Sequence, residues 1–200
     1  MKQIIWHNEI PQRTLEVARG ETLNMWLLCT TALRAEPLEI ILHEQAELSL
    51  TGLVVIGKED HAESLITITH RGKSSLSRVV VKAVLFDSAN LKFEPRAWIV
   101  KGARGASTNI TIRTLLVGKG ARDTSIPSME IDEQEVSARH AATIGRVGDE
   151  ELFYLQTRGI DRENGEHLMI SGFINDFIHH APEALQSALH SLLPSYEFTK

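Results

Sequence analysis

The sequence predicts a mainly β fold that is followed by a small C-terminal α-helical region. Up to about Gly148, short runs rich in Val, Ile, Leu and Thr are bounded by clusters of Gly, Lys, Asp or Ser. Several runs alternate between two faces, as strands do; in "SLITITH", Ile66, Ile68 and His70 share one face. No helical pattern separates the runs, which disfavours a parallel sheet built from βαβ units. After Gly148 the apolar period changes to that of a helix.

Six runs carry the clearest strand signal, at residues 50–57, 64–72, 78–86, 96–105, 109–122 and 125–135. Such strands can form a sandwich, a barrel or a β-helix of stacked coils. The phrases "KGARGAS" and "GKGARDTS" are similar, and their spacing is compatible with one coil of a β-helix. Periodicity by itself leaves the β-helix and the sandwich or barrel equally open.

Three helices are predicted in the last fifty residues. The first begins at Asp149 with acids in its first turn and ends at Gly159; Asp161 caps the second. Pro182 suits the start of the third, and Pro194 ends it. The apolar residues of the second helix follow a 3.6-residue period: Leu168, Ile170, Phe173, Ile174, Phe177 and Ile178. We therefore divide the chain into a β core at residues 1–148 and a helical region at residues 149–200.

Composition excludes several classes of protein. The chain has 200 residues and a formal charge of −5, which argues against the broad basic face of a nucleic-acid-binding protein. Its one cysteine, Cys29, lies in an apolar run and is interpreted as a buried small hydrophobe, so no disulfide framework is expected. The first residues lack the apolar run of a signal peptide, and no segment approaches a membrane span of about 18 apolar residues. A cytoplasmic location is expected.

Most of the candidate functional motifs have a simpler structural explanation. "GKGAR" lacks the spacing of a P-loop and suits a corner. The nine histidines are scattered without the spacing of a metal site, and His179 and His180 suit a surface pair. The acids Glu130, Asp132, Glu133 and Glu135 suit a solvated strand end. The alternative is a β-helix carbohydrate-active enzyme with Glu130 and Asp132 as acid and base.

His140 stands apart because of its position. It is expected just past the last strand, where Ala138, Ala141 and Ala142 leave it uncovered. From these residues alone, a structural or surface role is the simpler interpretation.

The segment "LLVGKGARDTSIPSMEIDEQEVSARHAATIGRVGDEELFYLQTRGI" resembles the C-terminal core of the SufB/SufD family of iron–sulfur cluster assembly scaffolds. The shared features are the "LLVG...A...P.MEI" strand pair, a single His followed by "A-T-I-G", and then "D-E-E-L-F-Y-L-x-x-R-G-I". The resemblance is strong over residues 114–178 and weaker before them. It implies a right-handed parallel β-helix with C-terminal helices, and so decides between the two β architectures.

The resemblance also implies partners. In that family two related scaffolds pair through the ends of their β-helices, and the C-terminal helices bind SufC, an ATP-binding cassette ATPase. The motif histidine lies at the scaffold interface and takes part in forming the nascent cluster; His140 occupies its position. An imidazole can ligate iron. Phe153, Tyr154 and Arg158 are the candidate residues for the ATPase-docking region, although packing is the favoured role for Phe153.

The chain departs from the SufB pattern near His140. SufB-type chains have a cysteine where Ile112 stands here, and glutamates where Arg139 and Ala141 flank the histidine. We therefore expect a non-enzymatic, SufD-like scaffold that dimerises through its final strands near residues 126–135, with itself or with a SufB-like chain. No tightly bound cofactor is expected, but a transient cluster can be shared with the partner. An interaction module that has lost cluster chemistry is the alternative.

Overall fold

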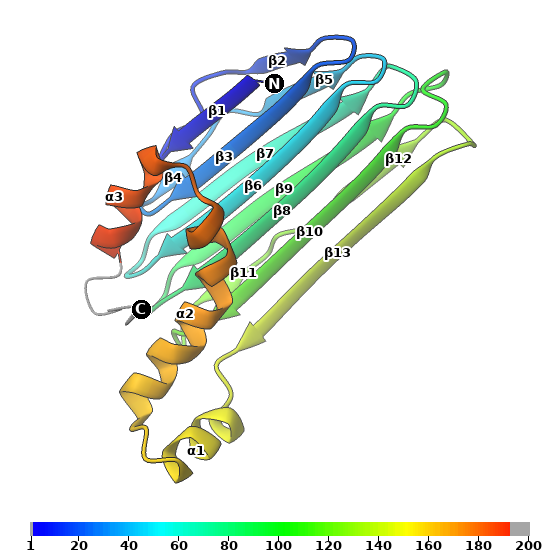
Figure 1. Ribbon diagram of the computed structural model, residues 1–200. Coiled ribbons are helices and arrows are strands. Elements are labelled where there is room, and N and C mark those ends of the chain that lie inside the picture. Colours follow the sequence, from blue (N-terminus) through cyan, green and yellow to red (C-terminus); the bar gives the residue numbers. More distant parts are fainter. Residues whose placement is uncertain (1, 193–200) are drawn as a thin grey trace.

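The computed structural model describes residues 2–192, with side chains up to Leu189, and it confirms the parallel β-helix, which has about five turns. Two facing sheets run the length of the molecule (Figure 1). Sheet A contains, in spatial order, β1 (Lys2–His7), β3 (Thr22–Cys29), β6 (Glu47–Ile56), β8 (Leu76–Leu85), β10 (Ser107–Leu116) and β13 (Ser137–Arg146). Sheet B contains β2 (Thr14–Val17), β4 (Leu33–Arg34), β5 (Leu38–Leu42), β7 (His61–His70), β9 (Asn90–Ile99), β11 (Arg122–Asp123) and β12 (Ser128–Ile131).

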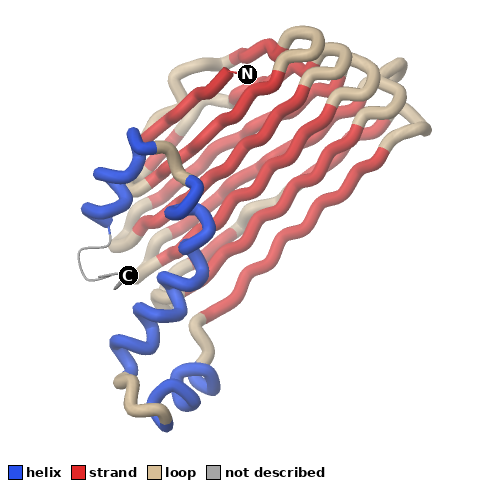
Figure 2. The backbone as a smooth tube through the Cα atoms, viewed as in Figure 1, coloured by secondary structure: helices blue, strands red, loops and turns tan. Residues whose placement is uncertain are grey.

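One coil contains about 30 residues, because Glu47, Leu76, Ser107 and Ser137 are successive partners in the register of sheet A. Each coil turns two corners, one at either end of the strands, as the tube in Figure 2 shows. "KGARGAS" and "GKGARDTS" lie at opposite corners, before and after β10, so their spacing is half a coil. The prediction that they mark one coil is therefore wrong. The phrases are alike because both corners need small residues.

The corner that precedes the sheet A strands is built from stacked left-handed residues. Gln45, Ser74 and Gly105 all have positive φ, and the backbone N–H of each donates to a carbonyl of the next coil. Gly72 lies at the same corner, where an added Cβ would clash with the backbone of Glu44. The corner thus continues the backbone hydrogen bonding of the sheets.

The core lies between the sheets and includes one buried histidine. The predicted faces of β7 are confirmed, since Ile66, Ile68 and His70 all point inward and are buried. His70 Nδ1 lies 2.8 Å from Ser75 Oγ, and its Nε2 lies 2.9 Å from Ser77 Oγ. Ser77 Oγ donates in turn to Thr108 Oγ1. Burial, only partly opposed by the Ser75 hydrogen bond, lowers the pKa of His70 to about 4.

His70 should therefore make stability depend on pH. Because its folded pKa lies below the value of about 6.5 for an unfolded chain, its stabilising effect is complete above pH 6.5 and is lost as pH falls towards 4. The loss is about 3 kcal/mol, since each pKa unit corresponds to about 1.4 kcal/mol. Urea unfolding at pH 7 and pH 4 measures it, with His70→Asn as the non-titrating control. Equal pH dependence in both proteins would show that His70 does not titrate as described.

Three helices follow the last strand: α1 (Asp149–Thr157), α2 (Arg162–His180) and α3 (Glu183–Leu192). Asp161 caps α2 as predicted, since its carboxylate accepts from the Asn164 N–H, and Gly159 has the positive φ expected after a helix. Ile170, Ile174 and Phe177 pack on the outer face of sheet A, against Leu28, Leu53 and Val84 among others. Leu168 is 53% exposed and does not join this core, contrary to prediction. Pro194 lies outside the described residues.

Candidate functional site at the exposed edge of the last coil

β13 is one of the two edge strands of sheet A, opposite β1. It pairs in parallel with β10, over ten residues, and it has no second neighbour among the described strands. Almost every side chain of β13 is exposed, whereas alternate side chains of β10 are buried. An uncovered strand of this length presents a row of free backbone groups to any chain that can pair with it.

The register identifies which backbone groups are free. The Ser137 N–H donates to the Ala106 carbonyl, and the Val147 N–H to the Leu116 carbonyl. Because backbone groups alternate sides along a strand, residues 137, 139, 141, 143 and 145 bond to β10. The N–H and C=O groups of His140, Ala142 and Ile144 therefore point away from the sheet.

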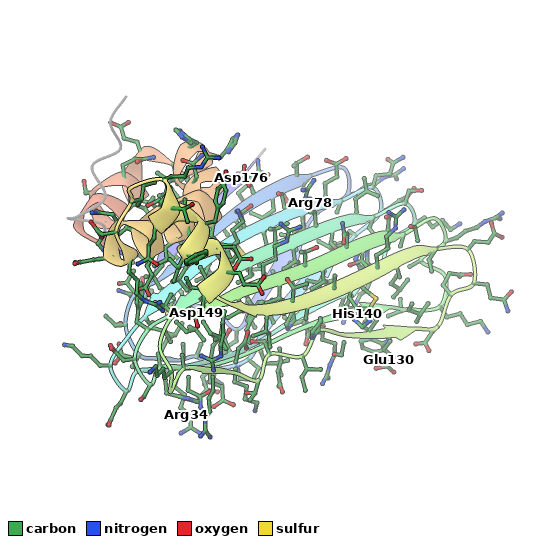
Figure 3. The ribbon with its side chains drawn as sticks, turned by 90° about the horizontal axis from the view of Figure 1, so that it is seen from below. Arg34, Arg78, Glu130, His140, Asp149 and Asp176 are labelled. Carbon is green, nitrogen blue, oxygen red and sulfur yellow. The ribbon has the colours of Figure 1, made fainter. Side chains whose placement is uncertain are left out.

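His140 lies within β13 and not past the last strand, so that prediction is wrong. In the register it faces Ile110, whose side chain is fully buried, so the imidazole lies on the inner side of the open end. Figure 3 labels it between the two sheets. Its Nδ1 lies 3.2 Å from the Pro127 carbonyl oxygen, in the segment that leads into β12. A carbonyl oxygen can only accept, so Nδ1 carries the proton and the Nε2 lone pair is left available.

The residues that flank His140 in sequence do not face the same way. Arg139 and Ala141 point to the outer side of sheet A, and Ile112 is buried inside, in register with Ala142. No group of three or more His, Cys, Asp or Glu residues within the described part of the chain could hold a metal ion. Because clusters are usually held by several thiolates, His140 could supply one ligand and the others would have to come from a second chain.

Apolar side chains surround the open end. Ile126 is 63% exposed, Ile144 is 50% exposed and Ile131 is 45% exposed. They come from β13, from β12 and from the segment before β12, so the same uncovered end of the β-helix joins them. Exposed apolar side chains that border one open end make that end a candidate interaction surface. The predicted interface near residues 126–135 therefore lies along one border of the open end of the β-helix, and β13 lies along the other border.

The candidate docking residues lie on α1, which extends beyond the sheets in Figure 1. Phe153 is 67% exposed, so the favoured packing role for it is wrong; Leu152 is the residue of α1 that is buried. Tyr154 is 57% exposed, and its hydroxyl accepts from Arg158 Nη2 at 3.2 Å. The Arg158 guanidinium also lies 5.2 Å from the Tyr154 ring. Tyr154 and the exposed Leu168 of α2 line one hollow of the α1–α2 hairpin, and Phe153 is exposed elsewhere on α1.

The acidic cluster after β12 takes part in local structure. Asp132 accepts from Trp98 Nε1 at 3.0 Å, and Glu135 pairs with Arg104 at 2.6 Å. Glu133 accepts from the backbone N–H groups of Gln134 and Gly102, which lower its pKa. Of the two acids named for a carbohydrate-active enzyme, Asp132 is engaged by Trp98. Glu133, with its lowered pKa, does not supply the raised carboxyl group that a glycosidase needs.

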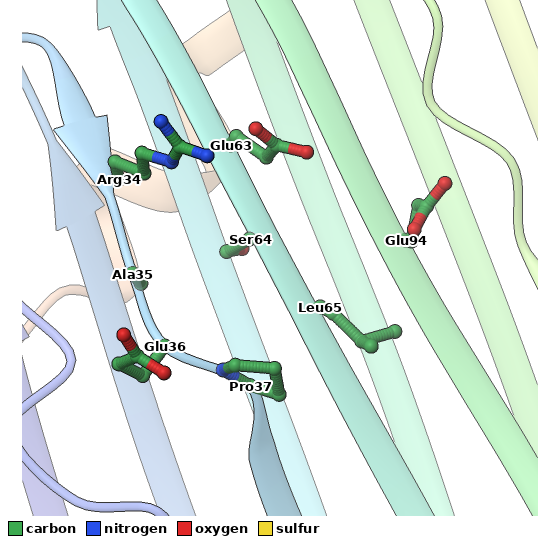
Figure 4. Close-up of a pocket in the computed structure, with 8 residues that line it drawn as sticks. All are labelled: Arg34, Ala35, Glu36, Pro37, Glu63, Ser64, Leu65 and Glu94. Carbon is green, nitrogen blue, oxygen red and sulfur yellow. The ribbon is translucent and has the colours of Figure 1, made fainter.

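A pocket of about 400 Å³ lies on the outer face of sheet B (Figure 4). Its charged groups are Arg34, Glu36, Glu63 and Glu94. Lys92 bonds Glu63 at 2.8 Å, which lowers the pKa of Glu63 and raises that of Lys92. Lys92 also lies 3.8 Å from Glu94, and Glu36 pairs with Arg13, so each carboxylate of the pocket has a cationic neighbour.

Cys29 is buried as predicted, and its Sγ donates to the Thr31 carbonyl. Burial raises the pKa of the thiol to about 11, so the thiolate form is scarce at neutral pH. Cys29 is therefore unsuited to hold a cluster.

Among the described residues, no helix is long and apolar enough to cross a bilayer.

These features define a class of protein: a parallel β-helix whose last coil ends in an exposed edge with one histidine, followed by helices on one sheet. The family described as "SUF system FeS cluster assembly, SufBD core domain" matches residues 15–173. The chain therefore belongs to the SufBD family. The family match also covers the strands before residue 114, where the resemblance in the sequence was weaker.

Two relatives illustrate the similarity. The iron-sulfur cluster assembly protein SufD of Bacillus subtilis (strain 168) is 36% identical over 145 residues, which are 72% of this chain and 33% of that protein. An iron-sulfur cluster assembly SufBD family protein of Staphylococcus saprophyticus is 27% identical over 180 residues, or 88% of this chain and 38% of that protein. The chain thus spans roughly a third of the length of these curated relatives.

Proposed function

We propose that the chain is a SufD-like scaffold for iron–sulfur cluster assembly that acts in the cytoplasm without catalysing a reaction. The observation that carries the proposal is the position of His140 on the free edge of β13, in a member of the SufBD family. The cluster is the cargo of such a scaffold and not a resident cofactor.

The partner pairs with β13, as a strand added to sheet A. Free backbone groups of His140, Ala142 and Ile144 supply the hydrogen bonds, and burial of the exposed Ile126, Ile131 and Ile144 adds hydrophobic stabilisation. The partner is a SufB-like chain or a second copy of this chain. Pairing places groups of the partner beside the open end of the β-helix.

His140 supplies one nitrogen ligand to the nascent cluster. Its Nε2 is available because Pro127 holds the proton on Nδ1, the arrangement that also orients metal-binding histidines in other proteins. The remaining ligands come from the partner, since Ile112, Arg139 and Ala141 cannot bind iron. Opening and closing of the interface controls access to the site.

The α1–α2 hairpin docks a SufC-like ATPase. Phe153 and Tyr154 provide exposed apolar and aromatic surface for this contact, and Arg158 holds the Tyr154 ring in place. Co-purification with a SufC-like protein tests this proposal. Loss of the ATPase from a Phe153→Ala/Tyr154→Ala variant supports it, whereas unchanged binding rejects the hairpin as the docking site.

His140→Ala should lower cluster delivery at least about tenfold in cells that depend on this chain, because the interface loses a ligand. The variant should still fold, since His140 is exposed and its removal leaves no buried group without a partner. Activity of an iron–sulfur reporter enzyme measures delivery, and His61→Ala, an exposed histidine on sheet B, is the control. Full delivery by the His140 variant would remove it from the site.

A second candidate is an interaction module that has lost cluster chemistry. Ile112 favours it, because no thiolate lies beside His140 in this chain. Such a module would still pair through β13 but would support no cluster with any partner. The two candidates therefore differ in reconstitution and not in partner binding.

A further inference from the structure

The outer face of the last three strands of sheet A is basic. β8, β10 and β13 contain Arg78, Lys82, Arg113, Arg139 and Arg146 and no Asp or Glu, although the whole chain has a formal charge of −5. Arg146 lies on the inner side and donates to the Gly118 carbonyl. The other four cations lie on the outer side, and Figure 3 shows Arg78 on the side of the molecule away from Glu130.

Three of these cations have no carboxylate partner. Arg78, Arg113 and Arg139 are exposed, and within residues 2–189 none of them forms an ion pair or a side-chain hydrogen bond. Arg78 and Arg139 stand in one row of the sheet with Asn109 between them, so their Cα atoms are about 10 Å apart. Arg113 follows four residues further along β10, about 13 Å from Asn109. The register of the sheet thus sets the spacing at which the three arginines leave the backbone.

The border with α2 indicates what matches this face. Lys82 Nζ donates to the Phe173 carbonyl at 2.8 Å and lies 5.6 Å from the Phe173 ring. Burial lowers the pKa of Lys82; Asp176 opposes the shift and Arg113 adds to it. Where the chain covers this face itself, α2 therefore brings the Phe173 carbonyl and ring to the cation, and Asp176 adds a favourable negative charge nearby.

The uncovered part combines cations with apolar and small polar side chains. Leu76 is 41% exposed at one end of the arginine row, Val80 is half-buried beyond it, and Thr111 lies beside Val80 in the register. Exposed apolar side chains beside arginines are typical of protein interfaces, whereas nucleic-acid interfaces are more polar and more positively charged, so this mixture suits a polypeptide better.

We propose that this face, defined by Arg78, Arg113 and Arg139, binds a carboxylate-rich segment of another protein. The surface lies on the outer side of sheet A and uses side chains, whereas edge pairing uses the free backbone groups of β13; only Arg139 belongs to both strand and surface. It is separate from the α1–α2 hairpin and does not require cluster chemistry. Pairing of opposite charges at such a surface increases the association rate and weakens with added salt.

The test measures binding of a fluorescein-labelled, 20-residue poly-glutamate peptide to the full chain by fluorescence anisotropy. In 50 mM NaCl we expect at least a tenfold loss of affinity in Arg78→Gln/Arg113→Gln/Arg139→Gln. The matched control is Arg71→Gln/Arg96→Gln/Arg122→Gln, which changes three other exposed arginines by the same total charge and should bind within twofold of wild type. Thermal melts confirm that both variants fold.

Three results would overturn the proposal. Equal loss in the two triple variants would mean that only net charge matters. Tighter binding of a DNA duplex than of the peptide, lost in the first variant, would identify a nucleic-acid surface. Salt-dependent self-association that the first variant abolishes would make a second copy the occupant. The Ala142→Pro variant should bind the peptide normally. Failure of the acidic-segment proposal is therefore distinguishable from failure of the proposed pairing along β13.

Discussion

Ala142→Pro is expected to weaken binding of a SufB-like partner by about 100-fold or more, which corresponds to about 2.7 kcal/mol. The Ala142 N–H points out of the sheet, so proline removes a donor that the partner strand needs and places a ring against that strand. The isolated chain should keep its stability within about 1 kcal/mol, because proline is tolerated where the N–H of an edge strand faces solvent. Titration calorimetry measures the affinity.

Ala141→Pro is the matched control, one residue away. The Ala141 N–H points towards β10, so proline breaks a hydrogen bond within the chain's own sheet. This variant should lose about 2 kcal/mol of unfolding free energy, as measured in urea. If Ala142→Pro bound the partner as wild type does, pairing along β13 would be wrong.

Phe177→Ala is expected to lower the free energy of unfolding by about 3 to 5 kcal/mol. Phe177 is 3% exposed, and its ring meets that of Trp26 edge to face, with centroids 5.4 Å apart. Truncation leaves a cavity between α2 and the outer face of sheet A, where Leu28, Leu53 and Val84 form the floor. Urea unfolding measures the loss, and faster hydrogen exchange in α2 should accompany it.

Phe153→Ala tests the opposite case on the same helical region. Because Phe153 is 67% exposed, its removal should change the free energy of unfolding by no more than about 0.5 kcal/mol. A loss as large as that of Phe177→Ala would mean that Phe153 packs into the core. The two variants together thus distinguish the buried side chains that attach the helices to sheet A from the exposed side chains of the helical region.

The sequence predicted the elements whose signals are local. Asp161 and Gly159 mark helix ends through their own hydrogen bonding and φ, and the alternation of β7 follows from burial of one face. β13 was not recognised as a strand, because an edge strand exposed on both faces needs no apolar alternation. Its conformation comes from pairing with β10, about 30 residues earlier in the chain.

The candidate site was predicted only in part. The resemblance identified His140, but no local pattern indicates that Pro127 fixes its tautomer or that Ile144 shares the inner side of the open end with it. The small residues Ala138 and Ala142, spaced by two about His140, were the available signal for an edge strand. Phe153 misled because an apolar residue in a helix suggests packing, whereas α1 extends beyond the sheet it would pack on.

The most direct measurement is anaerobic reconstitution with iron and sulfide, followed by visible absorbance. The chain is reconstituted alone, together with a SufB-like partner, and with the same partner as His140→Ala. We expect charge-transfer bands when wild-type chain and partner are both present, and much weaker bands with the His140 variant. Absence of bands from the wild-type complex, or equal bands with the variant, would contradict a cluster site completed at the β13 edge by His140.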